Sequence, residues 1–278
     1  MTLEKPNRAV ICLSGGMDST SLLLRLLAEG RQVYGLSFDY GQKHKIELQR
    51  LKRNLDYFQK HDLFVDSRII DMSQLGTLFR SALTDADWEI PTGYYEQENM
   101  KQTVVPNRNA IFASIAYGWA LSLAVEQDAK VDLCLGVHSG DHSIYPDCRP
   151  EFYHAIFQAF TIGNWEADKV SLYLPYLEGD KLSILQDADR SIQQLGLDFD
   201  TVFRNTITSY WPDESGLSQG LTGSDVERIL AFHHFGRPDP VGYQKPWEQV
   251  VQQALEFARQ YAESNLPDTD AHPIIPPT

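Results

Sequence analysis

The sequence predicts an α/β fold in which a parallel sheet carries helices on both faces. Over the first 200 residues, short apolar runs rich in β-branched residues alternate with longer runs that have apolar residues at helical spacing. Alternation of this kind is typical of β–α–β units with parallel strands. From about residue 200 the pattern changes to loops and amphipathic helices. We therefore expect a mostly helical C-terminal region beside the sheet.

The predicted elements follow one another in a regular order. Apolar runs at 9–13, 32–38, 63–70, 131–137 and 170–177 predict strands. Helical patterns at 20–30, 44–58, 108–126, 150–160, 181–196, 224–235 and 246–264 predict helices. Gly30 ends the first helix, because glycine readily adopts the left-handed conformation of a helix C-terminus. The run 108–126 is apolar on all sides, which predicts a buried helix.

Residues 71–107 interrupt this alternation. The segment is polar, aromatic and acidic, and it has no sustained period. A stretch this long without regular structure inside a domain predicts a functional loop or lid. We expect three parts in the chain: a sheet-containing domain over residues 1–200, a C-terminal helical region over 201–265, and a proline-rich disordered tail over 266–278.

Composition excludes several classes of protein. The 278 residues include 38 acids and 24 bases, for a net charge of −14, and the longest basic cluster is "RLKR" at 50–53, expected to be a solvated helix face. Binding to a nucleic acid backbone needs a basic surface, so direct nucleic acid binding is disfavoured. The chain has no uncharged apolar run near the roughly 20 residues that span a bilayer. Its N-terminal stretch lacks the long apolar core and cleavage pattern of a secretory signal, so we expect none. We expect a cytoplasmic protein without membrane contact.

The cysteines give no framework for disulfides or zinc. Cys12, Cys134 and Cys148 stand far apart, and none belongs to a CxxC pair. We expect each of them to be a small buried residue rather than a reactive thiol.

The stretch "SGGMDS" at 14–19 lies between the first predicted strand and the first helix. A glycine-rich turn that opens a helix binds anions, because backbone N–H groups converge there and the helix N-terminus is partly positive. Ser14, Ser19 and Thr20 add hydroxyl donors. Asp18 does not suit a bare phosphate, and it indicates helix capping or a metal ion beside the phosphates. The GK[ST] of a Walker-type P-loop is absent. Taken alone, the stretch leaves a well-capped structural turn as the alternative.

"SGGMDS" resembles the SGGxDS pyrophosphate-loop (PP-loop) signature of the adenine nucleotide α-hydrolase-like enzymes, which cleave ATP between the α- and β-phosphates. Four further motifs follow in order: "FDYGQKH" (38–44), "VPNRN" (105–109), "YPDCRPEF" (145–152) and "DK" (180–181). Together they resemble the 7-cyano-7-deazaguanine synthase family, QueC, over roughly residues 8–210. The resemblance implies a PP-loop fold and an ATP-dependent, C–N bond-forming ligase of queuosine biosynthesis.

The resemblance also implies a reaction. A carboxylate is a poor acylating agent because oxide is a poor leaving group. Attack of the carboxylate of 7-carboxy-7-deazaguanine on the α-phosphate of ATP, with Mg²⁺ holding the phosphates, gives an acyl-adenylate whose AMP leaves easily. Ammonia then forms an amide, and a second ATP activates this amide for dehydration to the nitrile.

The roles of individual residues are implied by the same motifs. Residues expected to bind ATP are Ser14, Gly15, Gly16, Asp18, Ser19, Asp39, Gln42 and His44. Those expected to bind the deazapurine are Tyr40, Arg108, Asn109, Asp141, Tyr145, Asp147 and Arg149. Asp18, Arg108 and Lys181 are expected to be catalytic. Without the family, a structural ion pair for Arg108 and a solvated position for Lys181 are equally good alternatives. Cys148 matches the family and is as well explained by packing as by chemistry.

The C-terminal part departs from the family pattern. Family members carry four cysteines in a CY…C-x2-C-x2-C arrangement that binds structural zinc. The corresponding positions hold Ser209, Ser218, Leu221 and Ser224. Serine is a weak zinc ligand and leucine is none, so we expect no zinc. The adjacent His233 and His234 do not indicate a replacement site. We expect packing to hold this region, with Trp211 and the added C-terminal helix contributing.

This departure leaves the acceptor open. Ammonia would lead to the nitrile, whereas a protein amine would give a deazaguanine–protein amide, as in bacterial anti-phage defence. A catalytically inert nucleotide-binding module is a further alternative, although the intact "SGGMDS" and "YPDCR" stretches argue against it. A tRNA-thiolating relative is disfavoured by the acidic charge. A protein acceptor and a homodimer both remain open as partners.

Overall fold

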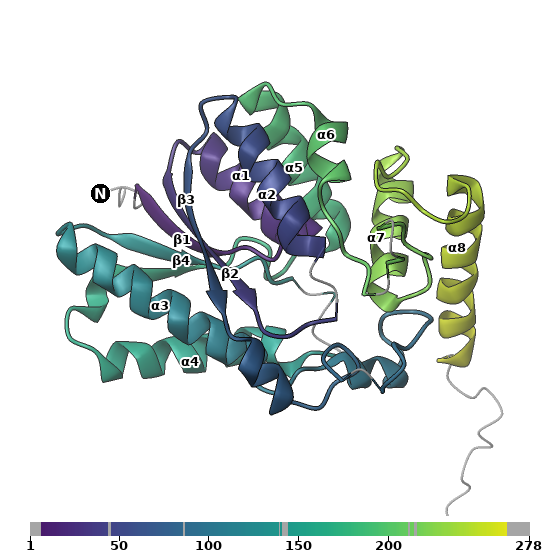
Figure 1. Cartoon of the computed structure of the whole chain (residues 1–278), viewed down its shortest axis with the longest axis horizontal. Coiled ribbons are helices and arrows are strands. Elements are labelled where there is room, and N and C mark those ends of the chain that lie inside the picture. The colour runs from purple at the N-terminus through teal and green to yellow at the C-terminus, as the bar shows by residue number, and fades with distance from the viewer. Residues whose placement is uncertain are drawn as a thin grey trace, which may run out of the picture.

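The computed structural model describes residues 7–43, 46–85, 87–138, 140, 144–210, 212–213 and 216–265. Its centre is a five-stranded parallel sheet, which confirms the predicted fold class (Figure 1). The strands are β1 (Arg8–Cys12), β2 (Gln32–Asp39), β3 (Val65–Asp71), β4 (Val131–Cys134) and β5 (Val170–Tyr173), in the spatial order β3-β2-β1-β4-β5. The order reverses between β1 and β4. In open parallel sheets, ligands bind outside the carboxyl ends of the strands at such a reversal.

Helices cover both faces of the sheet. They are α1 (Met17–Ala28), α2 (Ile46–Gln59), α3 (Arg108–Glu126), α4 (Pro150–Gly163), α5 (Lys181–Leu195), α6 (Phe199–Arg204), α7 (Gly223–Phe235) and α8 (Trp247–Ser264). Figure 1 shows α1, α2, α5 and α6 on one face, α3 and α4 on the other, and α7 and α8 beside the sheet. Every helix predicted from the sequence is present. The prediction did not include α6, whose six residues are too short for a periodic signal.

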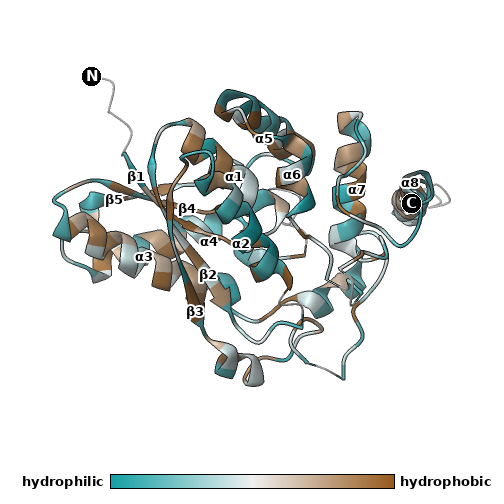
Figure 2. Cartoon of the chain, turned by 45° about the horizontal axis from the view of Figure 1, so that its top comes forward, coloured by the Kyte–Doolittle hydropathy of each residue, from teal (hydrophilic) through white to brown (hydrophobic). Residues whose placement is uncertain are grey.

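Two apolar cores lie on opposite faces of the sheet. Strand β1 supplies both, because successive side chains of a strand point to opposite faces. Ala9 and Ile11 pack with α1, α2 and α5, whereas Val10 packs with α3. Figure 2 shows the strands as largely hydrophobic and the outer surfaces of α2 and α5 as hydrophilic. The sheet is therefore covered on both sides, as parallel sheets require.

Helix α3 is only half buried, so the prediction of a fully buried helix was wrong. Ala116 and Ala120 are completely buried against the sheet, whereas Ser114, Gly118 and Ser122 are exposed. Ser114, Gly118 and Ser122 are small and uncharged, so the sequence pattern did not distinguish this exposed side from the buried one.

The C-terminal region is held by helix packing and by buried polar contacts. Val226 of α7 packs on Val250 and Ala254 of α8 in a third apolar cluster. A buried ion pair joins Arg228 Nε to Asp239 Oδ2 at 2.6 Å and Arg228 Nη2 to Asp239 Oδ1 at 2.9 Å. The added C-terminal helix thus contributes as expected, while Trp211 and the tail 266–278 lie outside the described residues.

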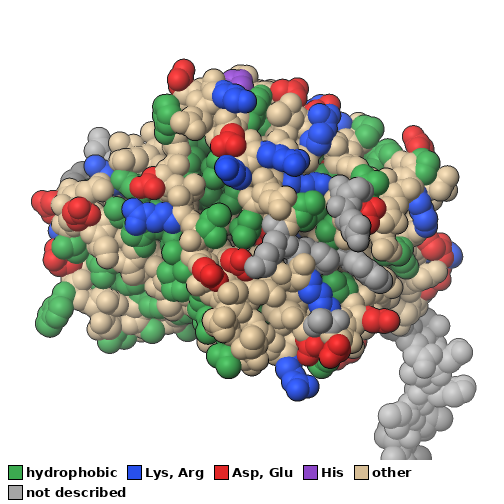
Figure 3. Space-filling view, viewed as in Figure 1, with side chains coloured by type: hydrophobic (Ala, Val, Ile, Leu, Met, Phe, Trp, Pro, Cys, Tyr) green, Lys and Arg blue, Asp and Glu red, His purple; other side chains and the backbone are tan. Residues whose placement is uncertain are grey.

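Arg50 attaches helix α2 to the C-terminal region. Its guanidinium donates hydrogen bonds to the carbonyl oxygens of Thr206, at 3.0 Å, and Gly216, at 2.7 Å. The prediction of a solvated face for the "RLKR" cluster was therefore wrong for Arg50. On the face of the molecule in Figure 3, acidic side chains are interspersed with basic ones. Among the described residues, no helix is long and apolar enough to cross a bilayer.

The turn after β1 packs tightly against the start of α2. Gly15 has φ +84°, and a Cβ placed on it would lie 2.5 Å from the backbone oxygen of Glu47. Gly30 is also left-handed, with φ +70°, but a Cβ there would meet no atom within 4 Å. Both glycines accommodate the same backbone conformation, and only Gly15 also permits a close backbone contact.

We predict that Gly15→Ala lowers the free energy of unfolding by roughly 2–5 kcal/mol, from backbone strain and the collision together. Gly30→Ala is the matched control and should cost roughly 1–2 kcal/mol, from strain alone. Urea unfolding of the two variants measures the difference. Equal losses would show that the contact with α2 can relax.

Candidate active site

A cavity opens at the carboxyl ends of β1 and β4, where the strand order reverses. Its wall includes Ser14, Gly16, Asp18 and Ser19 after β1, Tyr40 and Glu47 after β2, and Tyr95, Met100 and Thr103 from the irregular segment. It also includes Arg108, Asn109, Tyr145, Cys148, Lys181, Ile207, Thr208, Ser209, Tyr210, Ser224 and Glu227. The segment 71–107 therefore does contribute to a site, and so does the C-terminal region.

The serine–glycine turn, residues 14–19, is arranged by its own hydrogen bonds. The hydroxyl oxygens of Ser14 and Ser19 lie 3.0 Å apart, and the Gly16 N–H donates to Ser14 Oγ at 3.2 Å. Helix α1 begins at Met17, directly after the turn. Its N-terminus, with backbone N–H groups and two hydroxyls, therefore faces the cavity. This arrangement suits the phosphate groups of a nucleotide.

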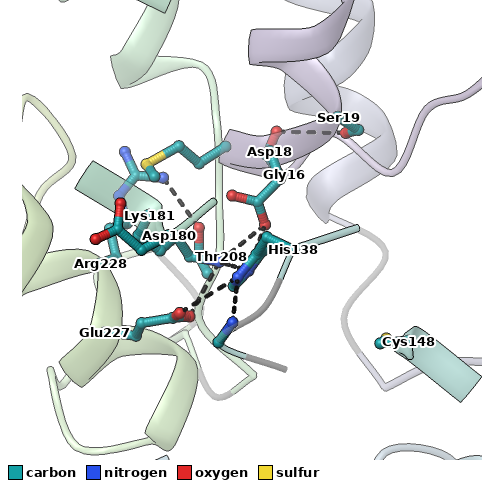
Figure 4. A network of polar contacts seen from close by, with 12 residues as sticks. Gly16, Asp18, Ser19, His138, Cys148, Asp180, Lys181, Thr208, Glu227 and Arg228 are labelled. Carbon is teal, nitrogen blue, oxygen red and sulfur yellow. Dashed lines mark hydrogen bonds and ion pairs between the residues drawn. The ribbon is translucent and has the colours of Figure 1, made fainter. Parts of the chain in front are cut away.

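Four polar side chains meet beside this turn, and we call them the Lys181 cluster (Figure 4). Lys181 Nζ lies 2.8 Å from Asp18 Oδ2, 3.0 Å from Glu227 Oε2 and 3.1 Å from His138 Nε2. Lys181 is only 6% exposed, which rules out the solvated position. Burial raises the pKa of Asp18, but Lys181 and His138 outweigh burial and hold this pKa below its usual value. Asp18 is therefore an ionised carboxylate at neutral pH.

Each member of the cluster is held by a different element. Lys181 is the first residue of α5, whose N-cap Asp180 accepts a hydrogen bond from Ser183 N–H at 2.7 Å. His138 follows β4, and its Nδ1 accepts a hydrogen bond from the Gly140 N–H at 3.1 Å. Glu227 lies in α7. The cluster thus joins the sheet to the C-terminal region.

Arg108 is the first residue of α3 and lines the cavity. It lies on the opposite side of the cavity from the helices of the Lys181 cluster. Its guanidinium lies over the ring of Tyr40, 5.8 Å from the ring centre, and Nη1 is 3.5 Å from Tyr40 Oη. Its Nε donates to Asn109 Oδ1 at 3.4 Å. Among the described residues, no carboxylate forms an ion pair with Arg108, so the structural ion pair is not found there. A planar cation in this position suits a carboxylate or phosphate of a ligand.

Asn109 and two tyrosines complete this side. Asn109 Nδ2 lies 3.5 Å from both the Asp147 carbonyl oxygen and Cys148 Sγ. Tyr145 Oη is hydrogen-bonded to Thr103 and lies 3.3 Å from Tyr210 Oη. Cys148 is buried, which agrees with the expectation of a packing role. Burial raises the pKa of the Cys12 thiol to about 12.

Several predicted site residues do not line the cavity. These are Gly15, Asp39, Gln42, Asp147 and Arg149. Gln42 is buried behind the wall, where its Oε1 accepts from the Tyr40 N–H at 2.9 Å and its Nε2 donates to Glu47 Oε1 at 2.8 Å. Its hydrogen bonds orient Tyr40 and Glu47. His44 and Asp141 lie outside the described residues.

Sequence reasoning missed Glu47, His138 and Glu227. The two glutamates lie in predicted amphipathic helices, where a charged side chain is expected to face solvent. His138 lies one residue beyond a predicted strand, and no spacing marked it. Burial raises the pKa of Glu47 to about 7, although the hydrogen bond from Gln42 and the charge of Arg108 oppose this shift.

A second polar group, the Asp225 cluster, lies beneath the cavity wall. The carboxylate of Asp225 accepts hydrogen bonds from Ser218 Oγ at 2.7 Å, Thr222 Oγ1 at 2.7 Å and Ser209 Oγ at 3.2 Å. All four side chains are buried. The structure therefore gathers Ser209 and Ser218 with Thr222 and Asp225, and Ser224 Oγ lies 3.1 Å from Thr222 Oγ1 at the edge of this group. Among the described residues, no group of three His, Cys, Asp or Glu side chains is arranged to hold a metal ion.

Comparison with known proteins decides the family. The model of the family described as "Queuosine biosynthesis protein QueC" matches residues 8–236. The chain belongs to the QueC family. This confirms the resemblance, the PP-loop fold and an enzyme of the ATP-dependent ligase type. Helix α8 lies beyond the matched residues.

Curated relatives are similar over most of their length. The chain is 43% identical to the 7-cyano-7-deazaguanine synthase 2 of Colwellia psychrerythraea, over 85% of this chain and 98% of the relative. It is 42% identical to the 7-cyano-7-deazaguanine synthase of Hahella chejuensis, over 86% of this chain and 94% of the relative. It is 39% identical to the 7-cyano-7-deazaguanine synthase of Caldicellulosiruptor saccharolyticus, over 87% of this chain and 99% of the relative.

We predict that Glu47 makes the QueC-family fold less stable as the pH rises. The pKa of Glu47 lies near 7 in the folded chain and at an ordinary value near 4.5 in the unfolded one. Between these values the unfolded chain has already released the proton, so stability falls with rising pH. Glu47→Gln removes this effect and should raise the free energy of unfolding at pH 8 by about 1–3 kcal/mol relative to the parent.

Urea unfolding of parent and variant at pH 4.5 and pH 8 tests this prediction. The gain should be smaller at pH 4.5, where Glu47 is protonated in the folded chain and half-protonated in the unfolded one. An equal difference at both values would mean that Glu47 titrates normally.

Proposed function

We propose that the protein adenylates the carboxylate of 7-carboxy-7-deazaguanine with ATP and then forms an amide at that carbon. One observation carries this proposal: the Lys181 cluster lies directly beside the serine–glycine turn in a cavity whose opposite side carries Arg108. A buried ammonium next to a phosphate-binding turn can stabilise the charge that develops on the α-phosphate during adenylation. The names of the curated relatives support the choice of substrate.

The turn and its neighbours form the ATP side of the proposed site. Ser14, Gly16 and Ser19 would bind the pyrophosphate through backbone N–H groups and hydroxyls. Asp18 Oδ1 is buried and has no hydrogen-bond partner among the described residues, which fits a carboxylate that holds Mg²⁺. Bound there, Mg²⁺ would neutralise phosphate charge.

Arg108 and its neighbours form the deazapurine side. The guanidinium would orient the substrate carboxylate toward the α-phosphate, while Tyr40, Asn109 and Tyr145 would contact the ring system. Asp147 does not belong to the cavity wall, and it remains a proposed member of this side because its buried Oδ1 has no hydrogen-bond partner among the described residues. Asp141 and Arg149 remain proposed members of this side.

Amide formation follows from the acyl-adenylate. An amine attacks the activated carbonyl carbon, the C–N bond forms, and AMP leaves with the electron pair of the C–O bond. Water competes for the same carbon, so the cavity must exclude it. With ammonia, a second ATP could carry the amide on to the nitrile. A protein amine in place of ammonia would end the sequence at the amide.

We predict that incubation with ATP, 7-carboxy-7-deazaguanine and ammonia yields AMP and at least the amide, identified by mass spectrometry. Asp18→Asn should reduce AMP formation by roughly 100-fold or more, because the change keeps the shape of the side chain and removes its charge. Thermal unfolding checks that the variant is folded. AMP release at the parent rate by this variant would contradict the assigned mechanism.

We further propose that the Asp225 cluster performs the structural role of the zinc site that the family resemblance implies, so that the protein carries no structural zinc. Three hydroxyls and one carboxylate connect Ser209 on the cavity wall to the first turn of α7. The cluster contains no cysteine or histidine, which are the usual ligands of structural zinc.

We predict that Asp225→Ala lowers the free energy of unfolding by roughly 3 kcal/mol or more, since it leaves three buried hydroxyls without their acceptor. Ser224→Ala is the comparison variant, because Ser224 bonds to Thr222 Oγ1 at 3.1 Å and not to the Asp225 carboxylate, and it should cost only about 1 kcal/mol. Elemental analysis of the parent provides the second readout. One equivalent of zinc per chain would overturn the proposal.

A further inference from the structure

Glu47 is a carboxylate of the cavity wall to which the proposed function gives no role. It lies in the first turn of α2, and its Oε1 accepts a hydrogen bond from Gln42 Nε2 at 2.8 Å. Among the described residues, Gln42 is the one side chain that donates to this carboxylate. An ionised carboxylate accepts about four hydrogen bonds. Glu47 therefore has capacity left for the donors of a ligand in the cavity.

The position of Glu47 is fixed through both its main chain and its side chain. Its carbonyl oxygen packs so closely on Gly15 that a Cβ there would lie 2.5 Å away. The side chain is held by Gln42, which is buried. Gln42 in turn donates to the Phe38 carbonyl oxygen at 3.3 Å and accepts from the Tyr40 N–H at 2.9 Å. The acceptor is therefore in place before a ligand binds, which lowers the entropic cost of binding.

An aromatic surface lies in the same cavity. Phe38, Tyr40 and Phe112 all belong to its wall. The rings of Phe38 and Phe112 are stacked with their centres 4.1 Å apart, and the ring centre of Tyr40 lies 5.5 Å from that of Phe112. Aromatic side chains of this kind pack well against the flat ring system of a base.

Glu47 and Arg108 place opposite charges near the Tyr40 hydroxyl. Burial raises the pKa of Tyr40, the charge of Arg108 opposes this shift, and the charge of Glu47 adds to it. Arg108 is hydrogen-bonded to Asn109 and Tyr40, whereas Glu47 is hydrogen-bonded to Gln42, so each charge can meet a different part of one ligand. A flat ligand with a carboxylate at one end and N–H donors at the other has the complementary polarity.

The N–H donors of a base suit Glu47 better than the phosphates of the nucleotide do. Burial raises the pKa of Glu47 to about 7, although the hydrogen bond from Gln42 and the charge of Arg108 oppose this shift. Donors of a ligand would stabilise the ionised carboxylate, whereas a phosphate would repel it and has no donor to offer.

We propose that Glu47 binds the six-membered ring of the deazaguanine, where the 2-amino group and the neighbouring ring N–H both donate to its carboxylate. This inference rests on the proposed function and names the residue that selects its substrate. The ligand class is a guanine-type base, in which an amino group stands beside a ring N–H. Its ring system would lie against the aromatic surface, and Arg108 would hold the carboxylate on the five-membered ring.

The 2-amino group is the probe of this contact. The analogue 7-carboxy-7-deazahypoxanthine lacks this group and is otherwise identical to 7-carboxy-7-deazaguanine. Calorimetry measures the binding of both compounds in the presence of α,β-methylene-ATP, which cannot be cleaved between the α- and β-phosphates. The parent should bind 7-carboxy-7-deazaguanine roughly 10- to 100-fold more tightly than the analogue, because the analogue loses a hydrogen bond to a charged group.

Glu47→Gln should remove this discrimination. If the new carboxamide keeps its oxygen on Gln42, it turns an NH₂ group toward the amino group of the base, and two donors repel each other. The variant should bind the two compounds with affinities within about threefold of each other. A variant that still discriminates as the parent does, or that loses both compounds by the same factor, would overturn the inference.

Asp56→Asn is the matched control. It makes the same change from carboxylate to carboxamide at an exposed position of α2, so the affinities for both compounds should stay at parent values. Loss of discrimination in this control as well would show that the effect does not come from Glu47. Thermal unfolding checks that each variant is folded.

Two further measurements separate this inference from other roles of the site. Glu47→Gln should change the affinity for α,β-methylene-ATP alone by less than about threefold. A larger loss, with the discrimination between the two bases retained, would assign Glu47 to the nucleotide and overturn the inference. Exchange of labelled pyrophosphate into ATP, dependent on 7-carboxy-7-deazaguanine, tests adenylation itself. Its absence in the parent would refute the proposed function, while the calorimetric ratio still decides the role of Glu47.

Discussion

The contact of one ammonium with two carboxylates organises this protein. Lys181 at the start of α5 is bonded to Asp18 after β1 and to Glu227 in α7, so a single cation links the turn, the sheet and the C-terminal region. Without it, two carboxylates would be buried within reach of each other and would repel, which costs free energy or forces one to bind a proton. The position of α7 on the sheet and the shape of the cavity therefore depend on the same charge balance.

Helix α7 makes three of these connections within four consecutive residues. Asp225 binds the hydroxyl of Ser209, Glu227 reaches Lys181, and Arg228 donates to Thr206 Oγ1 at 2.8 Å and to Thr208 Oγ1 at 3.1 Å. The contacts of Asp225 and Arg228 fix the segment 206–209, which contributes to one wall of the cavity. The Ile207 N–H donates to the carbonyl oxygen of Gly15 at 3.1 Å, so this wall also supports the serine–glycine turn. The C-terminal region is thus part of the site and not an appendage.

The strand–helix alternation predicted the sheet and seven of the eight α-helices in the described part of the chain, because periodicity records which side chains face a core. The serine–glycine turn was also predictable, since glycines and hydroxyls between a strand and a helix have few other uses. Glu47 and Glu227 were not, because a glutamate in an amphipathic helix has the same pattern whether it meets solvent or a cavity. Only the three-dimensional approach of α7 to α5 separates these two environments. The Asp225 cluster was not predicted for the same reason, because alignment with the family cysteines marks Ser209 and Ser218 but not the carboxylate that they contact.

The chemistry of the Asp225 cluster has a consequence for the conditions in which the chain can fold. A region fastened by thiolates and a metal unfolds when a chelator removes the ion or an oxidant couples the sulfurs. The side chains of Ser209, Ser218, Thr222 and Asp225 contain no sulfur and bond to one another through hydroxyls and a carboxylate. If this cluster takes the structural role proposed for it, neither a chelator nor an oxidant will loosen the region. The fold of this region would then be independent of the metal supply and of the redox state of its surroundings.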